Sequence, residues 1–237
     1  MDWQKVTKTC QNCHVKFIGP VKNTPMNTTL NALWQRHVRQ PLSRWGSALN
    51  THWTQPHWQA RREQVLHHDL HWCLRLNRHS ARQPVALGFK VISRLGDGIF
   101  WVGMAAATAL LTGPSGWPRL GWYMLCSHGG TRLYRVLKKT TVRPRPYQVH
   151  QAIRLGERPL DHFSFPSGHT LHAVMITLLL GQLAPVLLWV MVPFTVLVAL
   201  SRVILGLHYP SDVLAGAVLG AGLAGLGLLS GQWLWGH

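Results

Sequence analysis

Long apolar runs dominate the second half of the chain, whereas the first half is polar and basic. Glycine and proline residues interrupt the runs, notably within 113–118 and at 184–185, as is typical of breaks between helices. Several runs are shorter than the roughly 20 residues that a lipid-crossing helix needs, so flanking residues must complete them. The pattern predicts an all-α helical bundle embedded in a membrane over residues 84–237, with about five spans at 99–111, 120–137, 171–183, 186–200 and 213–235.

The basic region of residues 1–83 predicts two amphipathic helices. In 29–49 and again in 58–76, apolar residues recur at steps of three and four, while basic residues occupy the other faces. Basic helices with tryptophan at their boundary suit a membrane surface. Packing of the same helices on the rest of the protein is an equally good interpretation, and the two are compatible.

Two polar features lie close to or within the apolar runs. A bridging segment, 84–97, leads into the first run and ends in Gly96-Asp97-Gly98. We expect Asp97 to cap the next helix, rather than to be the hydrogen-bond partner of a base in an active site. Within the run 120–137, we expect His128 to be a packed, hydrogen-bonded histidine rather than a catalytic one.

The composition narrows the choice of partners. The formal net charge is +17 over 237 residues, which indicates anionic partners. Because apolar spans are present, we expect membrane lipids and a phosphorylated lipid substrate. We expect no nucleic acid as a partner, since no recognition motif accompanies the charge. The sequence does not indicate an oligomeric state.

The four cysteines are too few and too scattered for a disulfide framework. Cys10, Cys13 and His14 match the C-x-x-C-H pattern of c-type haem attachment. Haem attachment requires export, and residues 1–26 contain no continuous apolar core of a signal peptide. We therefore interpret the pattern as a chance match and expect no cofactor and no metal site.

The tetrad Pro166-Ser167-Gly168-His169 stands directly before the apolar run 171–183. Serine is a favoured helix N-cap, and glycine lets the backbone approach a ligand closely. Free N–H groups at a helix N-terminus attract anions, and a histidine beside such an anion can give or take a proton. The tetrad therefore predicts an anion site, although one tetrad is a weak signal alone.

The order of the spans brings further polar residues to the tetrad. Because spans alternate in direction, the end of the second, the start of the third, the end of the fourth and the start of the fifth lie on one side of the membrane. The loops on the opposite side, 112–119 and 184–185, hold only Arg119 as a basic residue. The shared side carries Lys138, Arg143, Arg145, Ser167, Gly168, His169, Arg202, His208 and Asp212.

This set of residues suggests phosphoryl transfer. Several fixed cations neutralise a phosphate and the charge that builds in its transition state. One histidine can be the nucleophile and another the general acid. Asp212 follows His208 by four residues and can orient its ring. The sequence contains no P-loop and no metal-ligand spacing, so we expect a metal-independent mechanism.

The same residues resemble the three-part signature of the type 2 phosphatidic acid phosphatase (PAP2) family. Its parts are Lys138-x6-Arg145-Pro146, then Pro166-Ser167-Gly168-His169, then Ser201-Arg202-x5-His208-x3-Asp212. The resemblance covers roughly residues 90–235 and implies an α-helical bundle shared with vanadium-dependent haloperoxidases. It implies that His208 attacks phosphorus, that Asp212 orients His208, and that His169 protonates the leaving group. The implied phosphate-binding residues are Lys138, Arg145, Ser167, Gly168 and Arg202.

The resemblance also implies an activity and a location. The chain is similar to shorter bacterial members that act on undecaprenyl pyrophosphate, which implies a multi-pass protein of the bacterial inner membrane. We expect hydrolysis of a lipid phosphate or pyrophosphate through a phosphohistidine. Phosphatidic acid or phosphatidylglycerophosphate is the next substrate class. Alternatives are vanadate-dependent halide oxidation and a non-enzymatic protein that binds anionic lipid. The basic tail favours a cytoplasmic site, whereas the resemblance slightly favours an outward-facing one.

Overall fold

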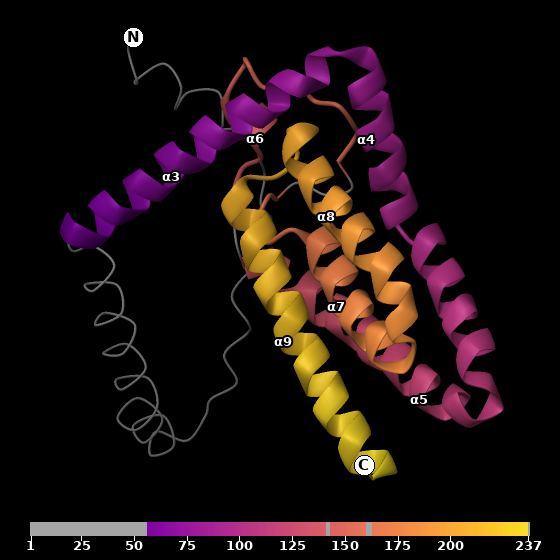
Figure 1. The fold of residues 1–237 in the computed structure, drawn as a ribbon. Helices are drawn as coiled ribbons and strands as arrows, with labels where there is room; N and C mark the ends of the chain where they lie inside the picture. Colours follow the sequence, from indigo (N-terminus) through magenta and orange to yellow (C-terminus); the bar gives the residue numbers. More distant parts are fainter. Residues whose placement is uncertain (1–55, 141–142, 160–162, 237) are drawn as a thin grey trace, which may run out of the picture. The chain divides into compact units, whose positions relative to one another are not determined.

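The computed structural model describes residues 56–140, 143–159 and 163–236, and all of their regular structure is helical (Figure 1). Residues Arg62–His237 form one compact unit. The predicted helix 29–49 and the Cys10, Cys13 and His14 pattern lie outside the described residues. The elements are α3 (Pro56–Asn77), η4 (Arg78–Ala81), α4 (Gln83–Gly96), α5 (Ile99–Thr140), α6 (Pro146–Val149), α7 (Gly168–Leu183), η5 (Pro185–Leu187), α8 (Leu188–Ile204) and α9 (Pro210–Trp235).

The first two predicted spans are the two arms of α5. The break between them lies at Gly113, whose φ of 63° and ψ of −173° are not helical. A positive φ is accessible to glycine at little cost, and Pro114 and Pro118 follow it within the element. The chain turns at this point, so that α5 has two arms (Figure 1). The predicted break within 113–118 is therefore confirmed.

Helix α7 is the centre of the bundle and packs against α5, α8 and α9. Its side chains belong to two core clusters. Ala173, Ile176 and Leu180 pack with Trp101 and Met191, while another set packs with α9. This central position buries most of α7 and fixes its N-terminus, which carries the PSGH tetrad.

A row of small residues lets α9 lie against the start of α7. A Cβ atom added at Gly216 would come within 2.4 Å of the Ser167 carbonyl oxygen. One added at Gly220 would come equally close, at 2.4 Å, to the carbonyl oxygen of Leu171. The two backbones thus approach too closely for any side chain at these positions, which is typical of close helix packing through small residues.

The interpretation of 84–97 as a bridging segment is wrong. The structure has a helix of 14 residues there, α4, which packs along α8. Its buried residues are Ser93 and Gly96, and Gly96 lies against the side chain of Val198. Ile92 also packs on the core around Trp101. Burial of this one face against α8 stabilises a helix whose sequence alone is short and interrupted by glycine.

Within the part of the chain that the structure describes, three helical segments are long and apolar enough to cross a membrane, namely Ile99–Lys138, Pro185–Ile204 and Pro210–Trp235. Helix α7 is apolar but has only 16 residues. Large apolar side chains on these helices point outward, including Leu110, Trp189 and Trp233, each 85% exposed. Such a surface is suited to contact with lipid.

Candidate active site

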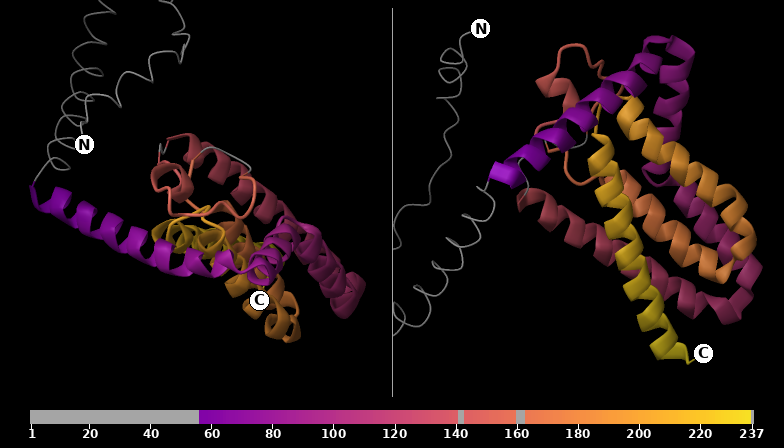
Figure 2. Two further views of the ribbon diagram at one scale, coloured as in Figure 1. Left: turned by 90° about the horizontal axis from the view of Figure 1, so that it is seen from above. Right: turned by 60° about the vertical axis from the view of Figure 1, so that its left-hand side comes forward.

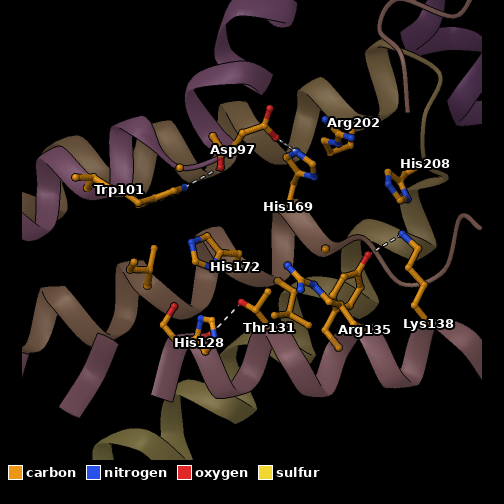
Figure 3. Close-up of a pocket in the computed structure, with 18 of the residues that line it drawn as sticks. Asp97, Trp101, His128, Thr131, Arg135, Lys138, His169, His172, Arg202 and His208 are labelled. Atoms are coloured by element: carbon orange, nitrogen blue, oxygen red, sulfur yellow. Dashed lines mark hydrogen bonds and ion pairs between the residues drawn. The ribbon is translucent and has the colours of Figure 1, made fainter. Parts of the chain in front are cut away.

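The predicted site residues meet at a cavity of about 950 Å³ (Figure 3). Its walls come from the junction of α4 and α5, both arms of α5, the N-terminus of α7 and the turn after α8. The structure therefore brings most of the predicted set together at one cavity. The predicted residues that line the cavity are Lys138, Arg145, Gly168, His169, Arg202 and His208.

His208 lies in the turn between α8 and α9 and is 1% exposed. Its Nε2 atom is 3.3 Å from Nη1 of Arg145, which also donates to the Leu207 carbonyl oxygen at 2.8 Å. Because a guanidinium can only donate, Nε2 is the acceptor and Nδ1 carries the ring proton. Burial lowers the pKa of His208 to about 3, against the opposing effect of Asp212. The imidazole is therefore neutral at physiological pH.

Asp212 lies beside His208, but its contact with the ring is not a hydrogen bond. Its Oδ2 atom is 3.7 Å from Nδ1 of His208, and that buried nitrogen has no hydrogen-bond partner among the residues that the structure describes. The carboxylate instead accepts from the Tyr209 backbone N–H at 2.9 Å, from Arg143 at 2.5 Å and from the Ser164 hydroxyl. Three donors thus fix the carboxylate, and its interaction with His208 is electrostatic.

His169 stands in the first turn of α7, and its Nε2 atom is hydrogen-bonded to the carboxylate of Asp97 (Figure 3). That hydrogen bond is the main cause that lowers the pKa of Asp97. The expectation that the Asp97 side chain is a helix cap is therefore wrong. The structure instead has the less favoured alternative, in which Asp97 is the hydrogen-bond partner of a histidine at the site. The sequence carries only a weak signal for this contact, a single carboxylate in a Gly-Asp-Gly turn. The packing of α4 against α8 brings Asp97 to α7.

Ser167 and Gly168 have different surroundings. Ser167 is fully buried, and its Oγ atom lies 3.0 Å from Oγ1 of Thr170, so its side chain does not line the cavity. Gly168 does line it, and a Cβ atom there would come within 2.5 Å of the Tyr134 ring. The Tyr134 hydroxyl in turn accepts a 2.6 Å hydrogen bond from Lys138. Glycine at 168 therefore makes room for the side chain that contacts this cation.

Arg202, at the end of α8, is held by residues that the sequence did not single out. Its Nη1 atom donates to Oγ of Ser93 in α4 at 2.5 Å and lies 3.9 Å from Oε2 of Glu157. Arg94 binds the other oxygen of Glu157 at 2.8 Å. The Nε atom of Arg202 is buried and has no hydrogen-bond partner in the described part of the chain. A donor of this kind suits an oxyanion entering the cavity.

Arg143 was predicted among the converging cations, and the structure gives it a different place. It does not line the cavity. Its two Nη atoms bind Asp212 at 2.5 Å and Asp69 of α3 at 2.7 Å, and its guanidinium stacks 4.1 Å from the Tyr209 ring centroid. Because Arg143 forms ion pairs with two carboxylates outside the cavity, it holds Asp212 in place rather than contacting a ligand.

Helix α3 braces the same loops with three buried side chains spaced by four residues. Asp69 accepts from the Ser211 N–H at 2.9 Å, in addition to its bond with Arg143. The Cys73 thiol lies 4.0 Å from the His208 carbonyl oxygen. Asn77 donates to the carbonyl oxygens of Ile204 at 2.8 Å and Arg154 at 2.9 Å.

This face of α3 passes across the ends of α8 and α9 (Figure 2). Side chains on other faces, such as Val65 at 53% and Trp72 at 47%, are exposed. Of the two interpretations of the amphipathic helices, packing on the rest of the protein thus holds for residues 69–77 of α3. The exposed apolar side chains remain compatible with a membrane surface.

Two further observations concern predicted chemistry. His128 is exposed and lines the cavity, so the expectation of a packed, hydrogen-bonded histidine is wrong. The second arm of α5 turns this residue toward the space between the two arms, which a linear apolar pattern does not reveal. Among the described residues, no three His, Cys, Asp or Glu side chains are grouped as they would be around a metal ion.

Comparison with known proteins identifies the family. The sequence model of the PAP2 superfamily matches residues 119–235. The decaprenylphosphoryl-5-phosphoribose phosphatase of Mycolicibacterium smegmatis is 35% identical over 144 residues, which are 58% of this chain and 74% of that protein. The undecaprenyl-diphosphatase of Sulfolobus acidocaldarius is 39% identical over 93 residues, or 38% of this chain and 44% of that protein.

Solved structures give the same result. LpxE of Aquifex aeolicus superposes with a TM-score of 0.55 at 26% identity, covering 66% of this chain and 92% of that one. A transmembrane PAP2-type phosphatidylglycerolphosphate phosphatase from Bacillus subtilis superposes with a TM-score of 0.55 at 24% identity, covering 80% and 94%. The second match shows the fold alone. Together with the apolar helices, these matches confirm the predicted all-α membrane bundle. The chain is a membrane protein that belongs to the PAP2 superfamily.

Proposed function

We propose that this protein is a membrane phosphatase that hydrolyses a lipid phosphate or pyrophosphate through a phosphohistidine at His208, without a metal ion. The observation that carries the proposal is a buried, neutral imidazole beside Arg145 in a cavity that Lys138 and Arg202 also line. A neutral imidazole is a nucleophile, and fixed cations stabilise the phosphoryl group that it attacks.

Binding comes first in the proposed reaction. Lys138, Arg145 and Arg202 hold the phosphate oxygens, and the backbone N–H of Gly168 at the start of α7 adds a donor. These groups supply the positive charge that a metal ion supplies in other phosphatases. Ser167 contributes as the N-cap residue that sets the path of the chain into α7.

Attack follows in line with the leaving group. Nε2 of His208 forms a bond to phosphorus as the bond from phosphorus to the leaving oxygen breaks. His169 gives its proton to that oxygen, and Asp97 favours the protonated ring through its hydrogen bond to Nε2. The phosphorylated His208 is cationic, and Asp212 stabilises it from the Nδ1 side. Water then attacks phosphorus with His169 as the base, which releases inorganic phosphate and restores both histidines.

The substrate class rests on the relatives and on the cavity. Two relatives bear names that refer to polyprenyl phosphates, decaprenylphosphoryl-5-phosphoribose and undecaprenyl diphosphate. Val102 lines the cavity and is also 71% exposed, so the cavity reaches the lipid-facing side of α5. We propose undecaprenyl pyrophosphate as the leading substrate, phosphatidic acid or phosphatidylglycerophosphate as the next, and the bacterial inner membrane as the location.

The test is phosphate release by detergent-solubilised protein in the presence of EDTA. We expect turnover of undecaprenyl pyrophosphate by the wild type and a loss of at least about a thousandfold in His208→Ala, because the nucleophile is missing. His71→Ala, which removes an exposed histidine of α3, is the matched control. Loss of wild-type activity in EDTA, or full activity in His208→Ala, would contradict the proposal.

A further inference from the structure

The cavity contains more cationic and hydrogen-bonding groups than one phosphate needs. Lys138, Arg145 and Arg202 gather around His208. A second set lies farther along the cavity, beyond His169, and lines it from α5 and α7 (Figure 3). This second set consists of His128, Thr131, Arg135 and His172.

Helical spacing orders these groups along α5. Thr131, Arg135 and Lys138 are separated by four and three residues, so they share one face of the helix. At 1.5 Å per residue, Arg135 stands about 4.5 Å along the axis from Lys138, and His128 about 15 Å. Arg135 is thus the cation next to the phosphate-binding group along this wall.

Helix α7 supplies the opposite wall. His172 follows His169 by three residues and lines the cavity, with its ring edge-on to Trp101 at 6.3 Å. The Nδ1 atom of His172 is buried and has no hydrogen-bond partner among the described residues. An unsatisfied buried nitrogen is costly, and a ligand group in the cavity can satisfy it.

The charge of the second set also calls for a ligand. Arg135 lies in the last turn of the segment Ile99–Lys138, and it is exposed while also lining the cavity, so its charge is accessible to a ligand there. Within the described ranges, Asp97 is the only carboxylate residue that lines the cavity, and it is hydrogen-bonded to His169. No carboxylate of the lining thus remains for Arg135.

In the proposed mechanism, the leaving group of the substrate occupies the part of the cavity that the second set lines. The leaving oxygen faces His169, so the leaving group extends from His169 away from His208, toward His172 and Arg135 (Figure 3). We propose that Arg135 and His172 form a second anion subsite, which binds a phosphate that stays on the leaving group. Thr131 adds a hydroxyl to it.

This inference rests on the proposed function and narrows its substrate class. The favoured substrates are lipids whose leaving group keeps a phosphate of its own. That phosphate is either joined directly to the cleaved one, as in a prenyl diphosphate, or separated from it by a sugar. Phosphatidic acid has an uncharged diacylglycerol as leaving group and leaves the second subsite without a partner.

The experiment compares three synthetic substrates with the same prenyl tail: a monophosphate, a diphosphate, and a phosphoribosyl phosphate. The full-length protein in detergent is assayed for kcat/KM as wild type, as Arg135→Gln and as Arg132→Gln. Arg132 is the matched control, because it is an exposed arginine of the same helix that does not line the cavity. The ratio of kcat/KM between two substrates is measured on one preparation of one variant, so it does not depend on the fraction of folded protein.

We expect Arg135→Gln to lower the preference for a two-phosphate substrate over the monophosphate by about ten- to a hundredfold, as the loss of a charged hydrogen bond does. The substrate whose preference falls identifies the spacing of the two phosphates. Arg132→Gln should keep the wild-type preference, and Arg135→Lys should restore part of it. An unchanged preference in Arg135→Gln, or an equal change in Arg132→Gln, overturns the subsite while the phosphatase activity stands. A wild type that hydrolyses none of the three overturns the proposed function as well.

Discussion

At the scale of single residues, the buried imidazole of His208 couples stability to pH. Its pKa lies at about 3 in the folded protein, below the ordinary value of 6.5. Between these values the unfolded chain binds a proton that the folded protein does not, so stability is full above pH 6.5 and is lost as the pH falls toward 3. We predict that Tm falls more steeply over this range in the wild type than in His208→Gln.

Thermal unfolding monitored by circular dichroism provides the measurement. His71→Gln is the control, since it removes an exposed histidine of α3. This control should follow the wild-type curve. Parallel curves for the wild type and His208→Gln would contradict a burial penalty at His208.

Asp97 makes a second prediction at this scale, for the activity. Its hydrogen bond to His169 favours the protonated ring, which is the form that donates to the leaving group. We expect Asp97→Asn to lower kcat by about ten- to a hundredfold, as a weakened general acid does. The alkaline limb of the kcat profile should also move to lower pH. Asp97→Glu, which keeps the charge, should recover part of the kcat and part of the shift in the alkaline limb. If the alkaline limb of Asp97→Asn stays at the wild-type pH, Asp97 is only structural.

The sequence predicted the residues of the site that local motifs mark. These residues are the cations and histidines that phosphoryl transfer needs, and all of them line the cavity: Lys138, Arg145, His169, Arg202 and His208. Their supporting partners escaped prediction, because tertiary packing alone brings them there. Three supporting residues lie between 72 and 142 positions away from their partners, each on a different helix or turn from its partner: Asp69, Ser93 and Asp97.

At the scale of elements, the contact of α9 with α7 depends on glycine. A Cβ atom at Gly220 would meet the Leu171 carbonyl oxygen, whereas one at Gly222 would meet nothing within 4 Å. We predict that Gly220→Ala destabilises the protein by about 1–3 kcal/mol, the usual cost of overpacking. Gly222→Ala should be neutral or stabilising by up to about 1 kcal/mol, because alanine favours helix. Reversible unfolding in detergent compares the two, and equal stabilities would contradict the close approach.

Helix α3 gives a second prediction for an element. Asp69, 5% exposed, joins α3 to Arg143 and Ser211, and its removal leaves Arg143 with one carboxylate instead of two. We predict that Asp69→Asn lowers the free energy of unfolding by about 3 kcal/mol, as breaking a buried ion pair does. Glu63→Gln, an exposed carboxylate on the same helix, is the matched control. Equal unfolding curves for the two variants would show that α3 does not brace the catalytic loops.

The apolar runs predicted the helices that lie deepest in the bundle, and they did so for a physical reason. A helix that is buried or faces lipid is apolar on every side, and α7, α8 and α9 show this in their sequences. Helix α4 escaped prediction, because it buries only one face, at Ser93 and Gly96, which are not apolar markers. The break at Gly113 was predicted, since glycine and proline are local signals.

At the scale of the whole molecule, the alternation of spans places the two ends of the bundle on opposite sides of the membrane. Val149 in α6 and Val186 in η5 are similarly exposed, at 60% and 64%, and lie at the two ends. We predict an outward-facing site, so that Val149→Cys reacts with a membrane-impermeant maleimide in intact cells. Val186→Cys should react only after permeabilisation. The reverse pattern would place the site in the cytoplasm, as the basic tail suggests.

The cavity between the arms of α5 has a consequence for how the enzyme meets its substrate. Val102 belongs both to its wall and to the lipid-facing surface, so a lipid can reach the site by lateral diffusion within one leaflet. The encounter rate then follows the mole fraction of substrate in the bilayer or micelle rather than its concentration in the whole solution. Added detergent dilutes the substrate surface and slows turnover, even when the total amounts of enzyme and substrate are constant.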